Sequence, residues 1–439
     1  MRSARIWTGI YRRSTMNAMA PVGAPSLPTA VDYRVYHDTQ IFAAEQRNIF
    51  KGRTWCYLGL EAEIPNAGDF RATHLGETPV VLVRGQEGKL HAWVNRCAHK
   101  GATVCRSLRG NQADGAFVCV YHQWAYDSEG TLVGVPFRRG MKGVGGYEKD
   151  FDLASHSLEK LRVESYKGMV FGTFSADIES LDDFLGPVMR KYIDRVFQRP
   201  IKVLGYSRQY MAGNWKLYSE NSRDSYHGGL LHLFYPTFGI YRQSQDSAGE
   251  LAEQGFHNVF TVSKPKGDID YGSFGDEANR EMQGSAKLQD ERLLQFRPEI
   301  EDDVGLHIQS LFPSVVLQQI QNTLATRQIV THGVDKTELV WTYFGYADDD
   351  EETTRHRLRN LNLVGPSGLI SMEDGEAVEL CQQGTVGAEG KHSFIEMGGD
   401  DVRGYYAPMG MDENAVRGFW KGYLSLMGDA LAVSAEASA

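Results

Sequence analysis

Two short cysteine–histidine pairs stand close together in the chain. Cys97 and His99 lie in the segment CAHKG, Cys119 and His122 lie in CVYHQW, and nineteen residues separate the two pairs. Thiolate and imidazole are the ligands of zinc, copper and iron–sulfur centres. Each pair is short enough to sit on one tight loop, so the pattern predicts a metal centre built from both loops.

Each pair contains one cysteine and one histidine, and this composition helps to decide which kind of metal centre the two loops form. Structural zinc is the first alternative, but zinc fingers take two Cys from one loop and two His from the other. A [2Fe–2S] cluster with two Cys on one iron and two His on the other needs one of each from both loops. The pattern favours the two-iron cluster. Four ligands are then present, so Cys105 is predicted to be a buried thiol, and Cys56 and Cys381 to be core residues.

A second group of metal-binding side chains lies in NWKLYSENSRDSYHGGLLHLF, which begins at Asn214. On a helix, Asp224 and His227 would share a face. His227 and His232 would be separated by about 140° around the axis, which is poor geometry for one metal. Gly228 and Gly229 stand between them and would allow a local distortion. This spacing alone fits two buried histidines as well as it fits an iron site.

Composition limits the class of protein. The 439 residues carry 46 Lys and Arg against 56 Asp and Glu, a net charge of −10, which disfavours general nucleic-acid binding. No apolar run approaches the roughly 18–20 residues of a membrane span. Five cysteines are too few for a disulfide scaffold. A large cytoplasmic globular enzyme is expected.

The elements that must position these residues follow from the periodicity. Asp38 is a plausible N-cap for a helix at 38–51, short turn-punctuated segments between Trp55 and Ser165 predict an all-β domain, and "GQEG" indicates a hairpin. Helices are expected at 180–197 and 413–431, and antiparallel strands at 307–312, 314–321, 323–331 and 338–346. The predicted organisation is a leader (1–32), an N-terminal helix on the catalytic domain (33–54), a cluster domain (55–165), a catalytic domain (166–430) and a tail (431–439).

The flanks of the two pairs, NRCAHKGATVC and CVYHQWAYDSEGTLVGVP, resemble the Rieske motif of ring-hydroxylating oxygenases. Lys100 replaces the usual Arg, Gln123 replaces a frequent Gly, and the spacing is slightly long, but no ligand is missing. The pattern NWK…EN…D.YH….H resembles the non-heme iron motif of Rieske oxygenase α subunits, and ISMEDGEAVEL resembles the segment that supplies the third ligand.

The resemblance implies a role for each site residue. Asp224 would link the cluster of one subunit, through its His122, to His227 of the next, and Asn221 would lie close to the iron. Glu373 and Glu376 are the alternatives to Asp374 as the carboxylate ligand. The implied cluster ligands are Cys97, His99, Cys119 and His122, and the implied iron ligands are His227, His232 and Asp374.

The resemblance runs from about residue 31 to residue 427 and is closest to salicylate, anthranilate, halobenzoate and terephthalate oxygenases. Arg327, in TLATRQIV, matches an arginine that holds a substrate carboxylate in that group. Composition alone would favour a solvated arginine on a strand. Arg223 and Arg242 are weaker candidates.

The implied fold is α+β: a β-sandwich Rieske domain beside a helix-grip catalytic domain with an antiparallel sheet covered by helices. The implied function is that of an oxygenase α subunit that hydroxylates an aromatic or heteroaromatic acid with O₂. Electrons would come from NAD(P)H through a reductase, with or without a ferredoxin, in a trimer with a small β subunit (α3β3). The alternatives are an α-only monooxygenase or demethylase, and a pure electron carrier.

Overall fold

The structure is a computed structural model that describes residues 29–112, 114–238, 245–264, 288–406 and 411–436. Most of the predicted leader, the end of the predicted tail and Arg242 lie outside these ranges. Within them, none of the helices combines the length and the hydropathy that a bilayer span requires.

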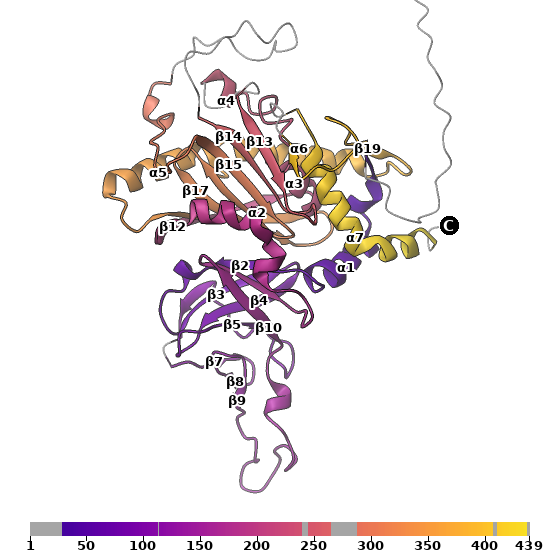
Figure 1. Cartoon of the computed structure of the whole chain (residues 1–439). Helices are drawn as coiled ribbons and strands as arrows, with labels where there is room; N and C mark the ends of the chain where they lie inside the picture. Colours follow the sequence, from indigo (N-terminus) through magenta and orange to yellow (C-terminus); the bar gives the residue numbers. More distant parts are fainter. Residues whose placement is uncertain (1–28, 113, 239–244, 265–287, 407–410, 437–439) are drawn as a thin grey trace, which may run out of the picture.

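An antiparallel sheet of seven strands forms the first half of the molecule, with the order β2-β11-β10-β5-β4-β3-β6. A small sheet of three strands, β7-β8-β9, extends from it on the side away from the rest of the chain (Figure 1). The all-β prediction is confirmed, although the large sheet continues to Thr173; the domain boundaries themselves stay a prediction. The strands are β2 (Cys56–Leu60), β3 (Asp69–Leu75), β4 (Thr78–Arg84), β5 (Leu90–Val94), β6 (Arg109–Asn111), β7 (Phe117–Val118), β8 (Ala125–Tyr126), β9 (Leu132–Gly134), β10 (Lys160–Tyr166) and β11 (Met169–Thr173).

A second antiparallel sheet has eight strands in the order β12-β18-β17-β16-β15-β14-β13-β20. β16 and β17 are buried along their whole length, because other elements cover both of their faces. All four strands predicted for this region are present. The strands are β12 (Ile201–Met211), β13 (Ser247–Leu251), β14 (Asn258–Ser263), β15 (Val304–Leu311), β16 (Val315–Ile320), β17 (Thr323–Thr331), β18 (Thr337–Tyr346) and β20 (Tyr405–Tyr406).

Helices pack around this second sheet (Figure 1), and the α+β class is confirmed. The two helices predicted near 180–197 and 413–431 are present as α2 and α7. Beyond these, β1 (Ala30–Asp32) pairs with β19 (His392–Phe394). The helices are α2 (Leu181–Val196), α3 (Trp215–Asn221), α4 (Phe234–Thr237), α5 (Glu351–Val364), α6 (Leu369–Thr385) and α7 (Asn414–Glu436).

The predicted N-terminal helix is also confirmed. The Asp38 carboxylate accepts hydrogen bonds from the amides of Gln40 and Ile41 and so caps α1 (Thr39–Glu45), which continues as the π-helical turn η2 (Gln46–Phe50). Glu45 is completely buried; it accepts from Lys216 of α3 and from Tyr423 of α7, each at 2.6 Å. α1 and α7 are thereby both tied to α3, the helix that leads into the histidine segment.

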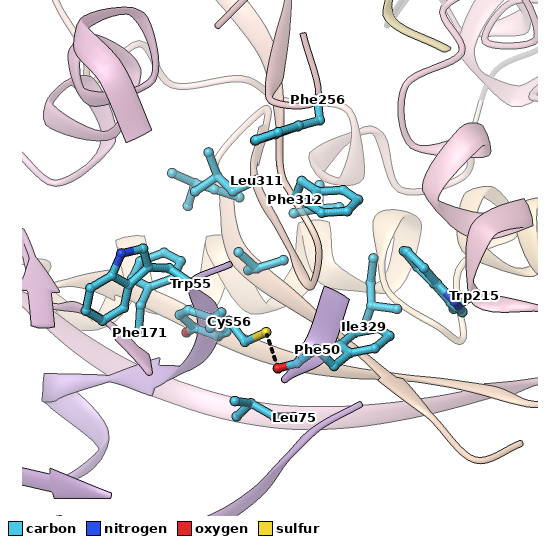
Figure 2. Close-up of a cluster of buried hydrophobic side chains, with 14 of the residues drawn as sticks. Phe50, Trp55, Cys56, Leu75, Phe171, Trp215, Phe256, Leu311, Phe312 and Ile329 are labelled. Atoms are coloured by element: carbon cyan, nitrogen blue, oxygen red, sulfur yellow. Dashed lines mark hydrogen bonds between the residues drawn. The ribbon is translucent and has the colours of Figure 1, made fainter. Parts of the chain in front are cut away.

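One hydrophobic core joins the two sheets (Figure 2). Phe171 of β11 and Trp55 contribute from the first sheet, and Leu311 and Ile329 from the second. The thiol of Cys56 is buried in this core, as predicted, and lies 3.8 Å from the carbonyl oxygen of Phe50. Cys381 was wrongly predicted to be a core residue, because it lies on an exposed face of α6.

Candidate metal centres and substrate pocket

Two loops of the first half bring the cysteine–histidine pairs together. Cys97 follows β5, and its loop closes by a hydrogen bond of 2.9 Å from the Gly101 amide to the Cys97 carbonyl. Cys119 lies in the turn between β7 and β8. The rings of His99 and His122 lie 4.5 Å apart, so the four predicted cluster ligands come from two facing loops.

The polar atoms at these loops fit a two-iron cluster. Nδ1 of His99 is buried with no hydrogen-bond partner, which is the state expected of a nitrogen reserved for a metal. Both sulfurs are buried, and Cys97 Sγ lies 3.3 Å from the Tyr126 hydroxyl. Two groups of three or more ligand atoms lie within 4.8 Å of one another among the described residues, and neither includes these cysteines. Zinc would need all four atoms around one point, so the geometry favours the cluster over zinc.

Gln123, which stands where Rieske motifs frequently have glycine, has an unusual backbone conformation. It lies directly after His122 and has a φ of +56°, in the left-handed region that glycine adopts without steric cost. This explains why a glycine is frequent at that position in Rieske motifs. The amide of Gln123 donates to the Cys119 carbonyl at 2.8 Å, which closes the turn in this conformation.

The histidine segment is not the helix assumed from the sequence. α3 ends at Asn221, and the residues from Ser222 to Leu233 form successive turns before α4 begins. Asp224 and His227 are therefore not related by helical spacing, although the two side chains do meet. The distortion expected around Gly228 and Gly229 is present as a run of turns, so the 140° separation of an ideal helix does not apply.

These turns bring His227 and His232 to one carboxylate of α6. His227 Nε2 lies 3.4 Å and His232 Nε2 lies 3.1 Å from the same oxygen, Oδ1 of Asp374. The three atoms form one of the compact groups that could hold a single metal ion. Two imidazoles and one carboxylate are the ligand set of non-heme iron centres with open positions.

The charges of this group are strongly coupled. Burial would lower the pKa of His227, but hydrogen bonds to Asp224 and Asp374 outweigh it and raise the pKa to about 10. Burial would raise the pKa of Asp374, yet the two histidines hold it well below its usual range. A metal cation bound between these three side chains would compete with protons for the two imidazoles.

The Nδ1 atom of each histidine, which does not face Asp374, also contacts a carboxylate. His227 Nδ1 lies 3.1 Å from Asp224 Oδ2, and His232 Nδ1 lies 2.8 Å from Glu373 Oε2. Such contacts fix the ring orientation of a metal ligand. Glu373 therefore orients His232. From the sequence Glu373 was considered only as an alternative iron ligand, and the one sign that it lies at the site was its position next to Asp374 in the chain. Asn221 Nδ2 donates to Asp374 Oδ1 at 3.1 Å, which places this predicted residue at the site.

A pocket opens beside the His227–His232–Asp374 group. Its walls are apolar side chains of β14, β15, β16 and α6, and Arg327 of β17 reaches it from the sheet. The guanidinium of Arg327 is buried, donates to Gln318 and to the Tyr218 hydroxyl, and lies 4.6 Å over the Trp341 ring. Arg327 is therefore not a solvated strand residue. The apolar lining comprises Phe260, Leu306, Ile308, Ile320 and Ile370.

Comparisons with known families agree with this geometry. The Rieske [2Fe-2S] domain matches residues 54–150, and the ring hydroxylating alpha subunit (catalytic domain) matches residues 184–429, which is more than half of the chain. The chain belongs to the ring-hydroxylating oxygenase α-subunit family. It is an oxidoreductase whose family carries a Rieske [2Fe–2S] cluster and a mononuclear non-heme iron and receives electrons from NAD(P)H through a reductase or ferredoxin.

Relatives of this α subunit cover nearly its whole length. It is 48% identical to the anthranilate 1,2-dioxygenase large subunit of Burkholderia cepacia over 91% of this chain and 93% of that protein. It is 44% identical to the terephthalate 1,2-dioxygenase terminal oxygenase component subunit alpha 2 of Comamonas sp over 91% and 96%. Naphthalene 1,2-dioxygenase from Rhodococcus sp. bound to indole shares the fold, with a TM-score of 0.76, 24% identity and coverage of 91% and 94%.

Proposed function

We propose that this α subunit hydroxylates an aromatic or heteroaromatic carboxylic acid. The observation that carries the proposal is the buried Arg327 beside the predicted iron ligands. Among the described residues, no carboxylate lies within ion-pair distance of its guanidinium, although Asp374 is close enough to affect it. A buried cation without a paired anion is costly, and a substrate carboxylate would supply the missing charge with bidentate geometry.

The relatives support the same substrate class. The names of the two oxygenases described above refer to anthranilate and terephthalate, and a third relative, 40% identical, is the salicylate 5-hydroxylase large oxygenase component of Ralstonia sp. All three names refer to aryl carboxylates. Both dihydroxylation and monohydroxylation occur among these names, so the proposal covers either outcome.

We assign the cluster to Cys97, His99, Cys119 and His122, and the iron to His227, His232 and Asp374. When bound, the iron supplies the centre at which O₂ is activated. Asp224 and Glu373 hold the two imidazoles, Arg327 anchors the carboxylate of the substrate, and the apolar walls of the pocket exclude water around the ring. Anchoring the acid at one end fixes which edge of the ring faces the iron ligands.

Electron transfer between two copies of the chain is part of the proposal. The β7–β9 sheet lies on the far side of the seven-stranded sheet from the catalytic half (Figure 1), and His122, in the turn between β7 and β8, is exposed. Asp224 is partly exposed. We propose that His122 of a second copy meets Asp224 in a trimer. The relatives are named as large or alpha subunits, which supports a small β subunit and an α3β3 assembly.

The experiment that tests the substrate class is a product assay. The purified enzyme, a surrogate reductase and NADH are supplied with a panel of aryl acids, each paired with its methyl ester. We expect hydroxylated product from at least one acid and little from the matching ester. Turnover of the esters or of neutral arenes in preference to the acids would contradict the proposal.

Arg327→Met removes the proposed carboxylate anchor. A charged hydrogen bond in a dry site is worth roughly 1.5–3 kcal/mol, so kcat/KM for the acid should fall by roughly 10- to 150-fold. The rate for the methyl ester should change much less. Arg355→Met is the matched control, because Arg355 is an exposed arginine on α5 and should leave both rates unchanged. An equal loss on acid and ester would refute the anchor role.

Asp224→Asn tests the route between subunits. The carboxylate holds His227 Nδ1 and also accepts from the Tyr226 amide at 2.7 Å, and an amide cannot accept from two imidazoles with the same charge assistance. Loss of such a supporting contact typically costs about 10- to 100-fold, and we expect turnover to fall by about 100-fold with both metals still bound. Asp348→Asn, at an exposed ion pair, is the control. Near-normal turnover at normal iron content would exclude the route.

A further inference from the structure

Glu220 is an ionisable residue that the proposed mechanism does not use. It stands near the end of α3, next to Asn221, and its carboxylate accepts a hydrogen bond of 2.5 Å from the hydroxyl of Tyr36 in the 3₁₀ turn η1 (Tyr33–Tyr36). Lys216, one helical turn earlier, already pairs with Glu45 at 2.6 Å. Glu220 therefore lies next to the buried hydrogen-bond network in which Glu45 of α1 contacts α3 and α7. Lys216 pairs with Glu45, so it does not form an ion pair with Glu220.

The side chain of Glu220 also reaches a cavity of about 210 Å³ on the side of α3 that faces α6. Asp224 and His227 line the same cavity, as do Cys381 and Glu413, and the remaining walls are mostly aliphatic. A water molecule needs only about 10–15 Å³ of such space, so several waters fit between Glu220 and Asp224. The cavity connects the half-buried acid Glu220 to Asp224, the carboxylate that holds an iron ligand.

The chemistry of the family requires protons at this place. Dihydroxylation combines the arene, O₂, two electrons and two protons into a dihydrodiol; monohydroxylation uses the same inputs to give a phenol and water. Electrons that arrive without protons would leave uncompensated negative charge in a buried site. The ionisable residues at the iron pocket already bind the metal or orient its ligands, so none of them is assigned as the proton donor. They are His227, His232, Asp374, Asp224 and Glu373.

We propose that Glu220 holds a proton and delivers it through water in this cavity toward Asp224 and the iron pocket as electrons arrive. The O–H bond of the Glu220 carboxyl breaks, the proton passes to cavity water, and the carboxylate takes up another proton from solvent through the same cavity. This inference rests on the proposed function, because it concerns how that reaction obtains its protons.

The surroundings of Glu220 suit a residue that gains and loses a proton near neutrality. Burial raises its pKa, the Tyr36 hydrogen bond and the charge of Lys216 oppose that rise, Asp224 adds to it, and the pKa lies at about 7. Arg223 on the same chain segment and Cys381 of α6 are the other ionisable groups that interact with it. Since the proton must be present to be donated, the supply should weaken as the pH rises through about 7.

A purely structural role is the alternative, in which Glu220 only pins η1 to α3 through Tyr36. Glu220→Gln separates the two roles, because the amide oxygen can still accept from the Tyr36 hydroxyl but the side chain has no proton to titrate. Tyr36→Phe is the matched control, since it removes the hydrogen bond and keeps the carboxyl. Glu220→Asp keeps an acid on a shorter side chain.

The first measurement is infrared spectroscopy of the holoenzyme, which does not depend on turnover. At about pH 6 the wild type should show a protonated buried carboxyl band that titrates away near pH 7 and that is absent from Glu220→Gln. The presence of this band in Tyr36→Phe would confirm that it comes from the Glu220 carboxyl group. If wild type and Glu220→Gln have the same carboxyl bands at this pH, Glu220 holds no proton and the proposal fails, whatever the activity of the variant.

The second measurement is the pH profile of product formation. Positioned proton donors contribute about 10²–10⁴-fold, and because cavity water can still carry protons we expect the low end, about a 100-fold loss in Glu220→Gln. The wild-type rate should decline above about pH 7, and that decline should vanish in Glu220→Gln and return in Glu220→Asp. A wild-type rate and profile in Glu220→Gln would overturn the proposal. If the wild-type enzyme hydroxylates no aryl acid, the proposed function is contradicted. The infrared measurement would still show whether Glu220 holds a proton.

Discussion

Asp374→Ala is expected to abolish product formation while leaving the visible spectrum of the Rieske cluster unchanged. One oxygen of Asp374 lies within 3.1–3.4 Å of both histidine Nε2 atoms, so its loss removes the anionic ligand and leaves two neutral imidazoles. Total iron should fall from about three to about two per chain, because the cluster alone carries two. Iron analysis and the visible spectrum are measured on the same sample.

Glu376→Ala is the matched control for this change. Glu376 lies two residues further along α6, is exposed, and was considered as an alternative ligand from the sequence. It should keep about three irons and near-normal turnover. The opposite result, iron lost from Glu376→Ala and retained in Asp374→Ala, would show that the carboxylate ligand is wrongly assigned. About two irons in the wild type would indicate an electron carrier instead of an oxygenase.

Cys97→Ser should have the complementary effect. A serine hydroxyl is a poor ligand for the iron of a sulfide cluster, so the visible spectrum should disappear and total iron should fall to about one per chain. Product formation with NADH and reductase should be lost, because electrons no longer reach the iron pocket. The mononuclear iron should remain, since the His227–His232–Asp374 group lies in the other half of the molecule.

Cys105→Ser tests whether this effect is specific. Cys105 is also buried in the cluster half, and its thiol donates a hydrogen bond to the Ser107 carbonyl oxygen at 3.4 Å. The prediction from the sequence that it is a plain buried thiol agrees with this contact. Its serine variant should keep the cluster spectrum. A full spectrum in Cys97→Ser, or a lost spectrum in Cys105→Ser at normal folding, would overturn the ligand assignment.

Local spacing predicted the cysteine–histidine centre, whereas the iron group with Asp374 followed from the resemblance to Rieske oxygenases. The two cysteine–histidine loops are short, so spacing alone indicates their convergence. The strands followed from short apolar segments between turns, and the amphipathic α7 followed from apolar residues at helical spacing. In the histidine segment the distortion expected at Gly228 and Gly229 extends further, as turns from Ser222 to Leu233, and no local signal indicated this extent.

Contacts between distant parts of the sequence could not be predicted in the same way. Glu373 meets His232 across 141 residues, and Tyr36 meets Glu220 across 184. No local spacing encodes such pairs, since they depend on how α6 and η1 pack against α3. The burial of Arg327 likewise follows from its position on a strand covered on both faces, and only resemblance to aryl-acid oxygenases singled it out beforehand.

The most direct test of the central claim, that both metal groups serve oxygenation of an aryl acid, is product analysis under ¹⁸O₂. The holoenzyme, reductase and NADH are incubated with the best acid of the panel, and the product is examined by mass spectrometry. We expect an aryl acid product that carries oxygen from ¹⁸O₂, and no such product from Asp374→Ala or Cys97→Ser. Product oxygen derived from water alone, or labelled product from either variant, would contradict this claim.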